Sequence, residues 1–126
     1  MMPGRIDAAD GKNALSVNAG ILESVWRPGS IVDVHDAKDA MLAVERLSGG
    51  TPMPMLSEMT DVEFSSAARY EFAQSTGVLA IAVLGSSTVD RVMAAATSRE
   101  THYPHEFFVS KDAALEWLKD FTKIRE

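Results

Sequence analysis

The sequence predicts an α/β fold with a five-stranded mixed sheet and four helices. Seven apolar residues, Val78–Leu84, lie between Gly77 and Gly85. A run so short and so apolar is typical of a strand with both faces buried, in a parallel sheet covered by helices. Before it, a predicted hairpin is followed by helical and strand segments in alternation. The predicted order is β-β-α-β-α-β-α-β-α, which favours a hairpin extended by right-handed βαβ crossovers.

The chain is predicted to begin with a flexible tail over residues 1–12, followed by a single domain over residues 13–126. The tail is rich in small residues, glycine and aspartate. The turn signal Asn18-Ala19-Gly20 separates two strand candidates, 13–17 and 21–27, and so predicts the hairpin. Strand alternation places Leu22, Ser24 and Trp26 on one face.

The first helix is predicted to begin at Asp33, which can cap it while Asp36 favours its first turn. Gly49-Gly50 ends it, because a glycine there can take the left-handed conformation. Residues 53–59 are predicted to form the third strand. The apolar residues that recur at helical spacing in this first helix are Ala37, Ala40, Met41, Val44 and Leu47.

Serines mark the starts of the remaining helices. Ser65 or Ser66 is predicted to cap the second helix, and Ser86 or Ser87 the third. If Ser87 is the cap, Asp90 three residues later resembles a capping box. Residues 105–109 form a last strand at the edge of the sheet. Ser110 caps a fourth helix, whose inward residues are Ala114, Trp117, Leu118 and Phe121.

Composition excludes several classes of function. The 126 residues are 46% hydrophobic, enough for one sizeable core, and include no cysteine for a disulfide or a thiolate metal site. A net charge of −6 argues against nucleic-acid binding and against docking on anionic membranes. No apolar run approaches the roughly 20 residues of a membrane span, and no secretory signal is recognisable. A cytoplasmic location is therefore expected.

Two histidines, His102 and His105, lie near Glu100 and Glu106 and could be taken for a metal site. His-x-x-His in a loop that contains Pro104 is not held on one helix face, and zinc sites usually recruit a further ligand. The favoured interpretation is a surface loop that leads into the last strand, so no metal is predicted.

No catalytic constellation is visible. Gly85-Ser86-Ser87 follows a strand and opens a helix, as a nucleophile elbow would, but Gly-x-Ser-x-Gly is absent and capping explains the serines better. Glycine patterns that bind phosphates or dinucleotides are also absent. The chain is therefore predicted not to be an enzyme and to need no cofactor.

Two further features suggest ligands. Arg69 and Arg91 lie near the starts of helices that follow parallel strands, where open α/β sheets often bind ligands. Together they could hold a carboxylate or phosphate, although two solvated arginines are the simpler interpretation. Methionines on the presumed core faces leave room for a lipid-like ligand, since methionine lines adaptable pockets. These methionines are Met41, Met53, Met55, Met59 and Met93.

The order of elements and several local motifs resemble the SpoIIAA-like, or STAS-like, fold of anti-sigma-factor antagonists. The resemblance extends to a group of small bacterial STAS/SEC14-type proteins and covers about Ala14 to Phe121. The motifs that carry it are Ile31-Val32-Asp33, Met55-Leu56, Val62-Glu63-Phe64-Ser65, Ala80-Ile81-Ala82-Val83 followed by Ser87 and Arg91, Pro104 to Phe107, and Lys111 to Leu118.

This resemblance implies a phosphorylation site. In signalling members a partner kinase modifies a serine at the start of the second helix, which implies Ser65 or Ser66 here. Free N–H groups at a helix start accept a phosphate, and the added charge can disrupt an apolar docking surface. Phe64 precedes the pair where those members have an aspartate, and a plain helix cap remains the favoured interpretation.

The resemblance thus implies a non-enzymatic interaction or regulatory module that docks a protein through the starts of helices two and three. Those starts are residues 64–69 and 86–91. A homodimer through a strand edge or helix face is also expected. The alternative is a carrier that holds an apolar or anionic small molecule between helices and sheet. The candidate surface residues are Phe64, Arg69, Ser86, Ser87 and Arg91.

Overall fold

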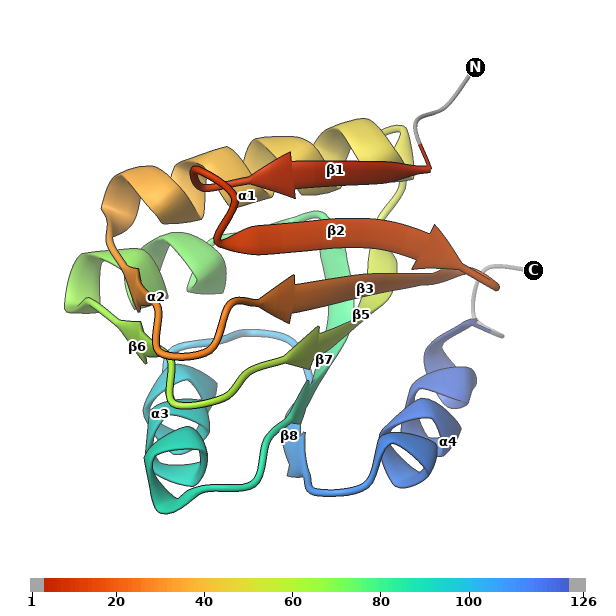
Figure 1. Cartoon of the computed structure of the whole chain (residues 1–126). Coiled ribbons are helices and arrows are strands. Elements are labelled where there is room, and N and C mark those ends of the chain that lie inside the picture. The colour runs from red at the N-terminus through yellow and green to blue at the C-terminus, as the bar shows by residue number, and fades with distance from the viewer. Residues whose placement is uncertain (1–3, 123–126) are drawn as a thin grey trace.

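The computed structural model describes residues 4–122, which form one main sheet, a short two-stranded ribbon and four helices (Figure 1). The strands of the main sheet are β1 (Arg5–Ala8), β2 (Asn13–Asn18), β3 (Ile21–Trp26), β5 (Met53–Glu58), β7 (Val78–Leu84) and β8 (His105–Phe108). The ribbon strands are β4 (Ile31–Val32) and β6 (Glu63–Phe64). The helices are α1 (Val34–Ser48), α2 (Ser66–Ala73), α3 (Thr88–Ser98) and α4 (Lys111–Thr122).

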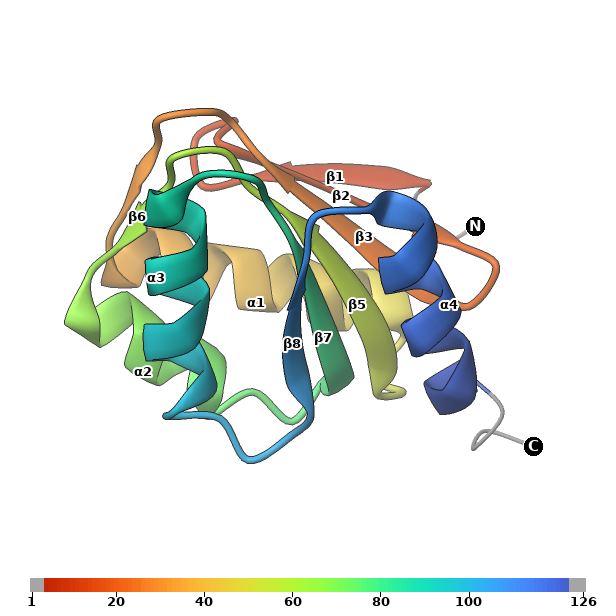
Figure 2. The same cartoon turned by 90° about the horizontal axis from the view of Figure 1, so that it is seen from below.

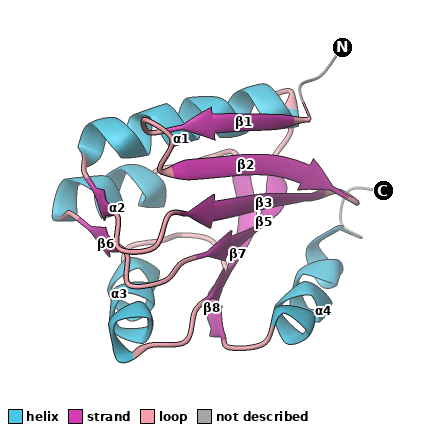
Figure 3. Cartoon of the chain, viewed as in Figure 1, coloured by secondary structure: helices cyan, strands magenta, loops and turns pink. Residues whose placement is uncertain are grey.

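The main sheet is mixed, as predicted, but it has six strands instead of five. Its order is β1-β2-β3-β5-β7-β8 (Figure 3). The first three strands are antiparallel, with β2 and β3 joined by the predicted hairpin, and the remaining neighbours are parallel. Ala19 and Gly20 both have positive φ at the hairpin turn, as a type I′ turn requires. The last strand, β8, is an edge strand, as predicted.

Helices cover both faces of β7, as its apolar sequence predicts. Figure 2 shows α3 and α4 on opposite sides of β7 and β8. Ile81 and Val83 join the larger core, to which α1, α2 and α3 contribute. Ala80 and Ala82 join a second core, in which Leu118 of α4 is fully buried. The strand therefore separates two apolar layers.

The prediction of a flexible tail over residues 1–12 is wrong for the part that is described. Residues 5–8 form β1, which pairs antiparallel with β2 in a register that places Ile6 opposite Leu15. Ala8 and Ala9 are buried in the larger core. Residues 1–3 and 123–126 lie outside the described part of the chain.

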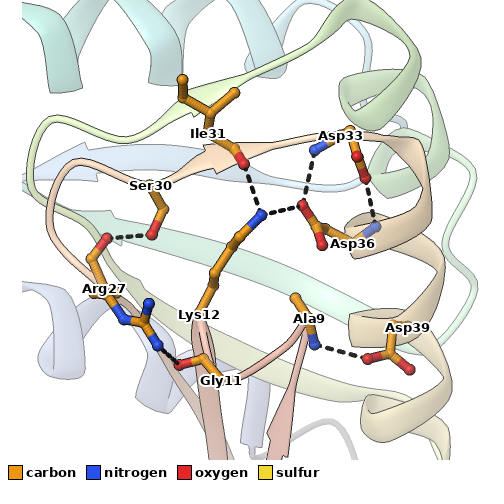
Figure 4. Close-up of polar contacts among 9 residues, drawn as sticks. All are labelled: Ala9, Gly11, Lys12, Arg27, Ser30, Ile31, Asp33, Asp36 and Asp39. Carbon is orange, nitrogen blue, oxygen red and sulfur yellow. Dashed lines mark hydrogen bonds and ion pairs between the residues drawn. The ribbon is translucent and has the colours of Figure 1, made fainter.

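Contacts with α1 hold the turn between β1 and β2 in place (Figure 4). Lys12 Nζ donates to Asp36 Oδ2 at 2.8 Å and to the carbonyl oxygen of Ile31 at 3.1 Å. The backbone N–H of Ala9 donates to Asp39 Oδ2 at 2.7 Å. The hydrogen bond to Asp36 raises the pKa of Lys12 above its ordinary value, so this turn is held by a charged pair.

The caps follow the predicted residues. Asp33 and Asp36 form a reciprocal capping box at the start of α1, and Gly49 ends it in the left-handed conformation. Of the alternatives left open, Ser65 caps α2 and Ser87 caps α3. The short ribbon of β4 and β6 was not predicted, because two-residue strands leave no periodic pattern in a sequence.

Candidate functional site

The start of α3 is organised around a buried carboxylate. Asp90 is 0% exposed, and its Oδ2 accepts hydrogen bonds from the N–H groups of Ser86 and Ser87 at 2.9 and 3.1 Å. Its Oδ1 accepts from the N–H of Asp61 at 2.7 Å. The carboxylate therefore satisfies two N–H groups of the chain that leads into α3 and one N–H group of the loop at Asp61.

These contacts set the charge of Asp90. Burial by itself would raise the pKa of Asp90, but the hydrogen bonds from Ser86, Ser87 and Asp61 outweigh it and lower the pKa below its ordinary value. The carboxylate is consequently ionised at neutral pH. It ties the loop at Asp61 to the start of α3, and Ser87 Oγ reinforces this tie by donating to Asp61 Oδ1 at 2.8 Å.

Gly85 is the position that makes room for Asp90. A Cβ at Gly85 would lie 2.7 Å from Asp90 Cβ and 2.9 Å from Asp90 Oδ2. We therefore expect Gly85→Ala to lower the free energy of unfolding by about 2 kcal/mol, since the carboxylate must shift away from its donors. Denaturant unfolding measures the loss. Gly77→Ala is the matched control, because its Cβ would meet Val44 Cγ1 at an ordinary 3.5 Å. Equal stability of the two variants would contradict the crowding.

The start of α2 presents the two predicted serines differently. Ser65 Oγ accepts from the N–H of Ala68 at 3.0 Å, so its side chain serves as the cap. Ser66 is exposed at the first position of the helix, with its Oγ 3.4 Å from Nη2 of Arg69. Both serines lie at the surface, and phosphorylation of either remains a prediction.

The structure does not bring Arg69 and Arg91 together. Arg69 Nη1 donates to the carbonyl oxygen of Phe64 at 2.8 Å, and its Nε lies 3.5 Å from Oε1 of Glu100, beyond the end of α3. Arg91, in the first turns of α3, packs its guanidinium 4.8 Å from the ring centre of Phe107. Glu100, which contacts Arg69, lies nine residues after Arg91 in the sequence, and nine residues span roughly 13 Å along a helix. This spacing separates the two arginines. Each arginine therefore has its own partner inside the fold.

A short segment of chain nevertheless joins the starts of α2 and α3. Asp61, held on α3, is only four residues from the cap Ser65, which is at most about 14 Å of chain. Two apolar side chains flank this segment, Ile31 with 68% exposure and Val89 with 44%. Ile31 is paired directly with Glu63 in the ribbon. We call this surface the rim; it comprises Ile31, Asp61, Glu63, Ser65, Ser66, Ser86, Ser87 and Val89.

Phe64, predicted as a surface residue, instead packs partly inside. Its ring lies 5.5 Å from those of Trp26 and Phe72, in edge-to-face contacts. Trp26 is only 4% exposed, so the hairpin face that carries it packs against the helices. Alternation along β3 had placed Leu22, Ser24 and Trp26 on one face, and the structure buries all three. Phe64 therefore supports the core below the rim.

Beneath these rings lies a partly open cavity of about 50 Å³, between the sheet and helices α1, α2 and α3. Four of the five core methionines noted in the sequence line it, while Met53 does not. Such a volume accommodates a few water-sized groups, and the flexible methionine side chains can adapt to larger ones. The lining methionines are Met41, Met55, Met59 and Met93.

The two histidines that were considered as metal ligands, His102 and His105, lie in different environments. His102 is exposed, whereas His105 lines the cavity, and burial lowers the pKa of His105 to about 4. At neutral pH the His105 imidazole is therefore uncharged. Among residues 4–122, no group of three or more histidine, aspartate or glutamate side chains is arranged to hold a metal ion.

The polar residues of the cavity are the part of the site that we did not predict. Asn13 and Ser24 are 1% and 3% exposed, and Ser57 is the neighbour of Ser24 on the adjacent strand. A signal was present, because alternation placed Ser24 between Leu22 and Trp26 on the apolar face. A polar residue at a core position of a strand is a sign that the buried site has a special role. Only the folded sheet, however, shows that Asn13, Ser24 and Ser57 are neighbours.

Comparison with known proteins places the fold of this chain in a wider group. Residues 15–122 match the model of a family described as a domain of unknown function (DUF7793). A crystal structure of an uncharacterized protein of the DUF3478 family from Shewanella loihica PV-4, described as having a SpoIIAA-like fold, is similar to this chain. Its TM-score is 0.61 at 17% identity, over 84% of this chain and 91% of that one. No curated protein matches this sequence. The predicted SpoIIAA-like fold is confirmed.

Proposed function

The chain belongs to the DUF7793 family, and we propose that it is a non-enzymatic interaction module that docks a protein partner on the rim. The observation that carries this proposal is the short, fixed connection between the starts of α2 and α3. Asp90 fixes Asp61 to the start of α3, and the following four residues lead directly to the cap of α2. A preorganised surface loses little conformational entropy on binding, which favours recognition.

The chemistry of the rim suits a protein surface. Ile31 and Val89 offer exposed apolar area, while Asp61 and Glu63 supply negative charge between them. Protein interfaces combine apolar anchors with a polar surround in this way. We therefore expect a partner with apolar side chains bordered by basic residues. We place this activity in the bacterial cytoplasm, on the strength of the fold resemblance and of a sequence without cysteine. No helix within residues 4–122 is long and apolar enough to cross a membrane.

A charge on Ile31 tests the docking surface. Affinity purification with Ile31→Glu is expected to recover the partner at least about tenfold less than with wild type, because a buried unpaired carboxylate opposes docking. Leu42→Glu is the matched control, since Leu42 is 60% exposed on α1, away from the rim. Recovery of the same proteins at the same level by Ile31→Glu and by wild type would refute docking on the rim.

Regulation through Ser66 is a separate part of the proposal. A phosphate there would add a charge of about −1.5 to −2 to a rim that is already acidic. We expect Ser66→Asp to reduce partner recovery, and the neutral isostere Ser66→Asn to retain it. Equal recovery by both variants would leave Ser66 without a switching role, while the Ile31 comparison still decides whether the rim docks a partner.

A further inference from the structure

The side chain of Arg69 joins the start of α2 to the chain beyond α3. Its Nη1 donates to the carbonyl oxygen of Phe64 at 2.8 Å, and its Nη2 lies 3.4 Å from Ser66 Oγ. Its Nε lies 3.5 Å from Oε1 of Glu100 but makes no hydrogen bond, although this nitrogen is buried. The guanidinium is therefore shared between Ser66 and Glu100, and one of its donors is left unsatisfied.

The contact between Arg69 and Glu100 is a loose one. The two charged groups lie 3.5 Å apart without a hydrogen bond, and the Glu100 side chain is 38% exposed. Ion pairs that water reaches contribute little to stability, whereas a phosphate offers three strong acceptor oxygens and a charge of about −1.5 to −2. Guanidinium groups bind phosphate through paired N–H groups at short distances. A phosphate within reach of Arg69 is therefore a better partner for it than Glu100.

We propose that phosphorylation of Ser66 transfers Arg69 from Glu100 to the phosphate and so releases the chain after α3 from α2. This inference rests on the regulation through Ser66 proposed above. Ser66 is exposed, so a kinase reaches its hydroxyl. The Oγ–P bond forms as the bond from phosphorus to the nucleoside diphosphate breaks, and the hydroxyl proton passes to a base of the kinase. Because Oγ already lies 3.4 Å from Nη2 of Arg69, rotation of the two side chains brings phosphate and guanidinium together.

The effect of this transfer extends beyond the rim. Glu100 belongs to the chain that leads from α3 to β8, and Tyr103 in the same segment donates from its hydroxyl to the carbonyl oxygen of Phe72 in α2 at 3.0 Å. The ion pair and this hydrogen bond are two links between that segment and α2. Loss of the ion pair leaves the Tyr103 link and sets the Glu100 carboxylate free. A modification on the rim is thereby felt at residues 99–102.

The second pKa of a phosphoserine at position 66 reports whether Arg69 binds the phosphate. We expect ³¹P NMR titration of the full chain to give a pKa lower by at least about 0.5 than in the Arg69→Gln variant, because a nearby positive charge favours the dianion. Arg46→Gln is the matched control and leaves this pKa unchanged. Arg46 lies about 18 Å along α1 from the helix start, near which Ser65 N–H donates to the carbonyl oxygen of Val32. Equal pKa values in wild type and Arg69→Gln would overturn the proposal.

The transfer itself is read at Glu100. In ¹H–¹⁵N spectra we expect phosphorylation to shift the backbone amides of residues 99–102 and the Nε–H signal of Arg69. Glu100→Gln removes the competing charge, so it should abolish most of the amide shifts and retain the lowered pKa of the phosphoserine. Amides at 99–102 that do not respond in wild type, or that respond equally in Glu100→Gln, would refute the transfer.

These measurements separate the transfer from docking on the rim. Both use the chain without a partner, so they give an answer whether or not Ile31→Glu weakens partner recovery. If Arg69→Gln fails to fold, the comparison of wild type with Glu100→Gln still decides the matter, because the exposed Glu100 side chain is a position where a neutral isostere is tolerated.

Discussion

Asp90→Asn is expected to lower the free energy of unfolding at pH 7 by about 3 kcal/mol. The carboxylate accepts three backbone N–H groups in a fully buried position. An asparagine keeps the shape but turns an NH₂ group toward donors, so at least one buried donor is left unsatisfied. The loss should exceed that of Gly85→Ala, which displaces the carboxylate without removing it.

The pH dependence of this effect has a definite sign. The folded-state pKa of Asp90 lies below its unfolded value, so the carboxylate stabilises the fold fully above about pH 4 and loses that contribution as the pH falls through the folded-state pKa. Urea unfolding of wild type and Asp90→Asn should therefore differ by a constant amount near neutral pH and converge in acid. Asp112→Asn, in the exposed first turn of α4, is the control and should cost little. A difference that does not change with acidification would contradict ionisation of Asp90.

Leu118→Ala is expected to cost about 3 kcal/mol, because Leu118 is fully buried in the second core. Removing its side chain leaves a void between α4 and the strands β5 and β7. Leu115→Ala, on the same helix but only half-buried, should cost about 1 kcal/mol. Thermal or denaturant unfolding distinguishes the two. Equal losses would show that α4 does not hold its face of the sheet as described.

Local patterns in the sequence predicted the parts of the fold that depend on neighbouring residues. The apolar run at β7, the cap at Asp33 and the paired cap candidates, Ser65 or Ser66 and Ser86 or Ser87, are signals contained within a few positions. The strand β1 was missed because Arg5–Ala8 has only two apolar side chains. It is held by antiparallel pairing with β2 and by burial of Ala8 in the larger core, while Asp36 and Asp39, more than twenty residues away in the sequence, hold the turn that follows it.

In the candidate sites, too, local sequence patterns predicted some features, whereas others depend on contacts between residues far apart in the sequence. The helix starts that form the rim were predicted, because capping residues identify them. Phe64 was placed on the surface by its position before a cap, but contacts with Trp26 and Phe72 draw it inward. The cavity was anticipated only as methionine-lined space. Its polar end requires Asn13, Ser24 and Ser57 to be adjacent across three strands, which depends on the register of the sheet.

The borders of the main sheet affect how copies of the chain can associate. Both border strands, β1 and β8, have only four residues, and charged or polar side chains interrupt each of them, including Arg5, Asp7 and Glu106. A strand added at either border would form few hydrogen bonds, and short, charged edges are a common protection against aggregation. Self-association by continuing the sheet into a second molecule is therefore disfavoured.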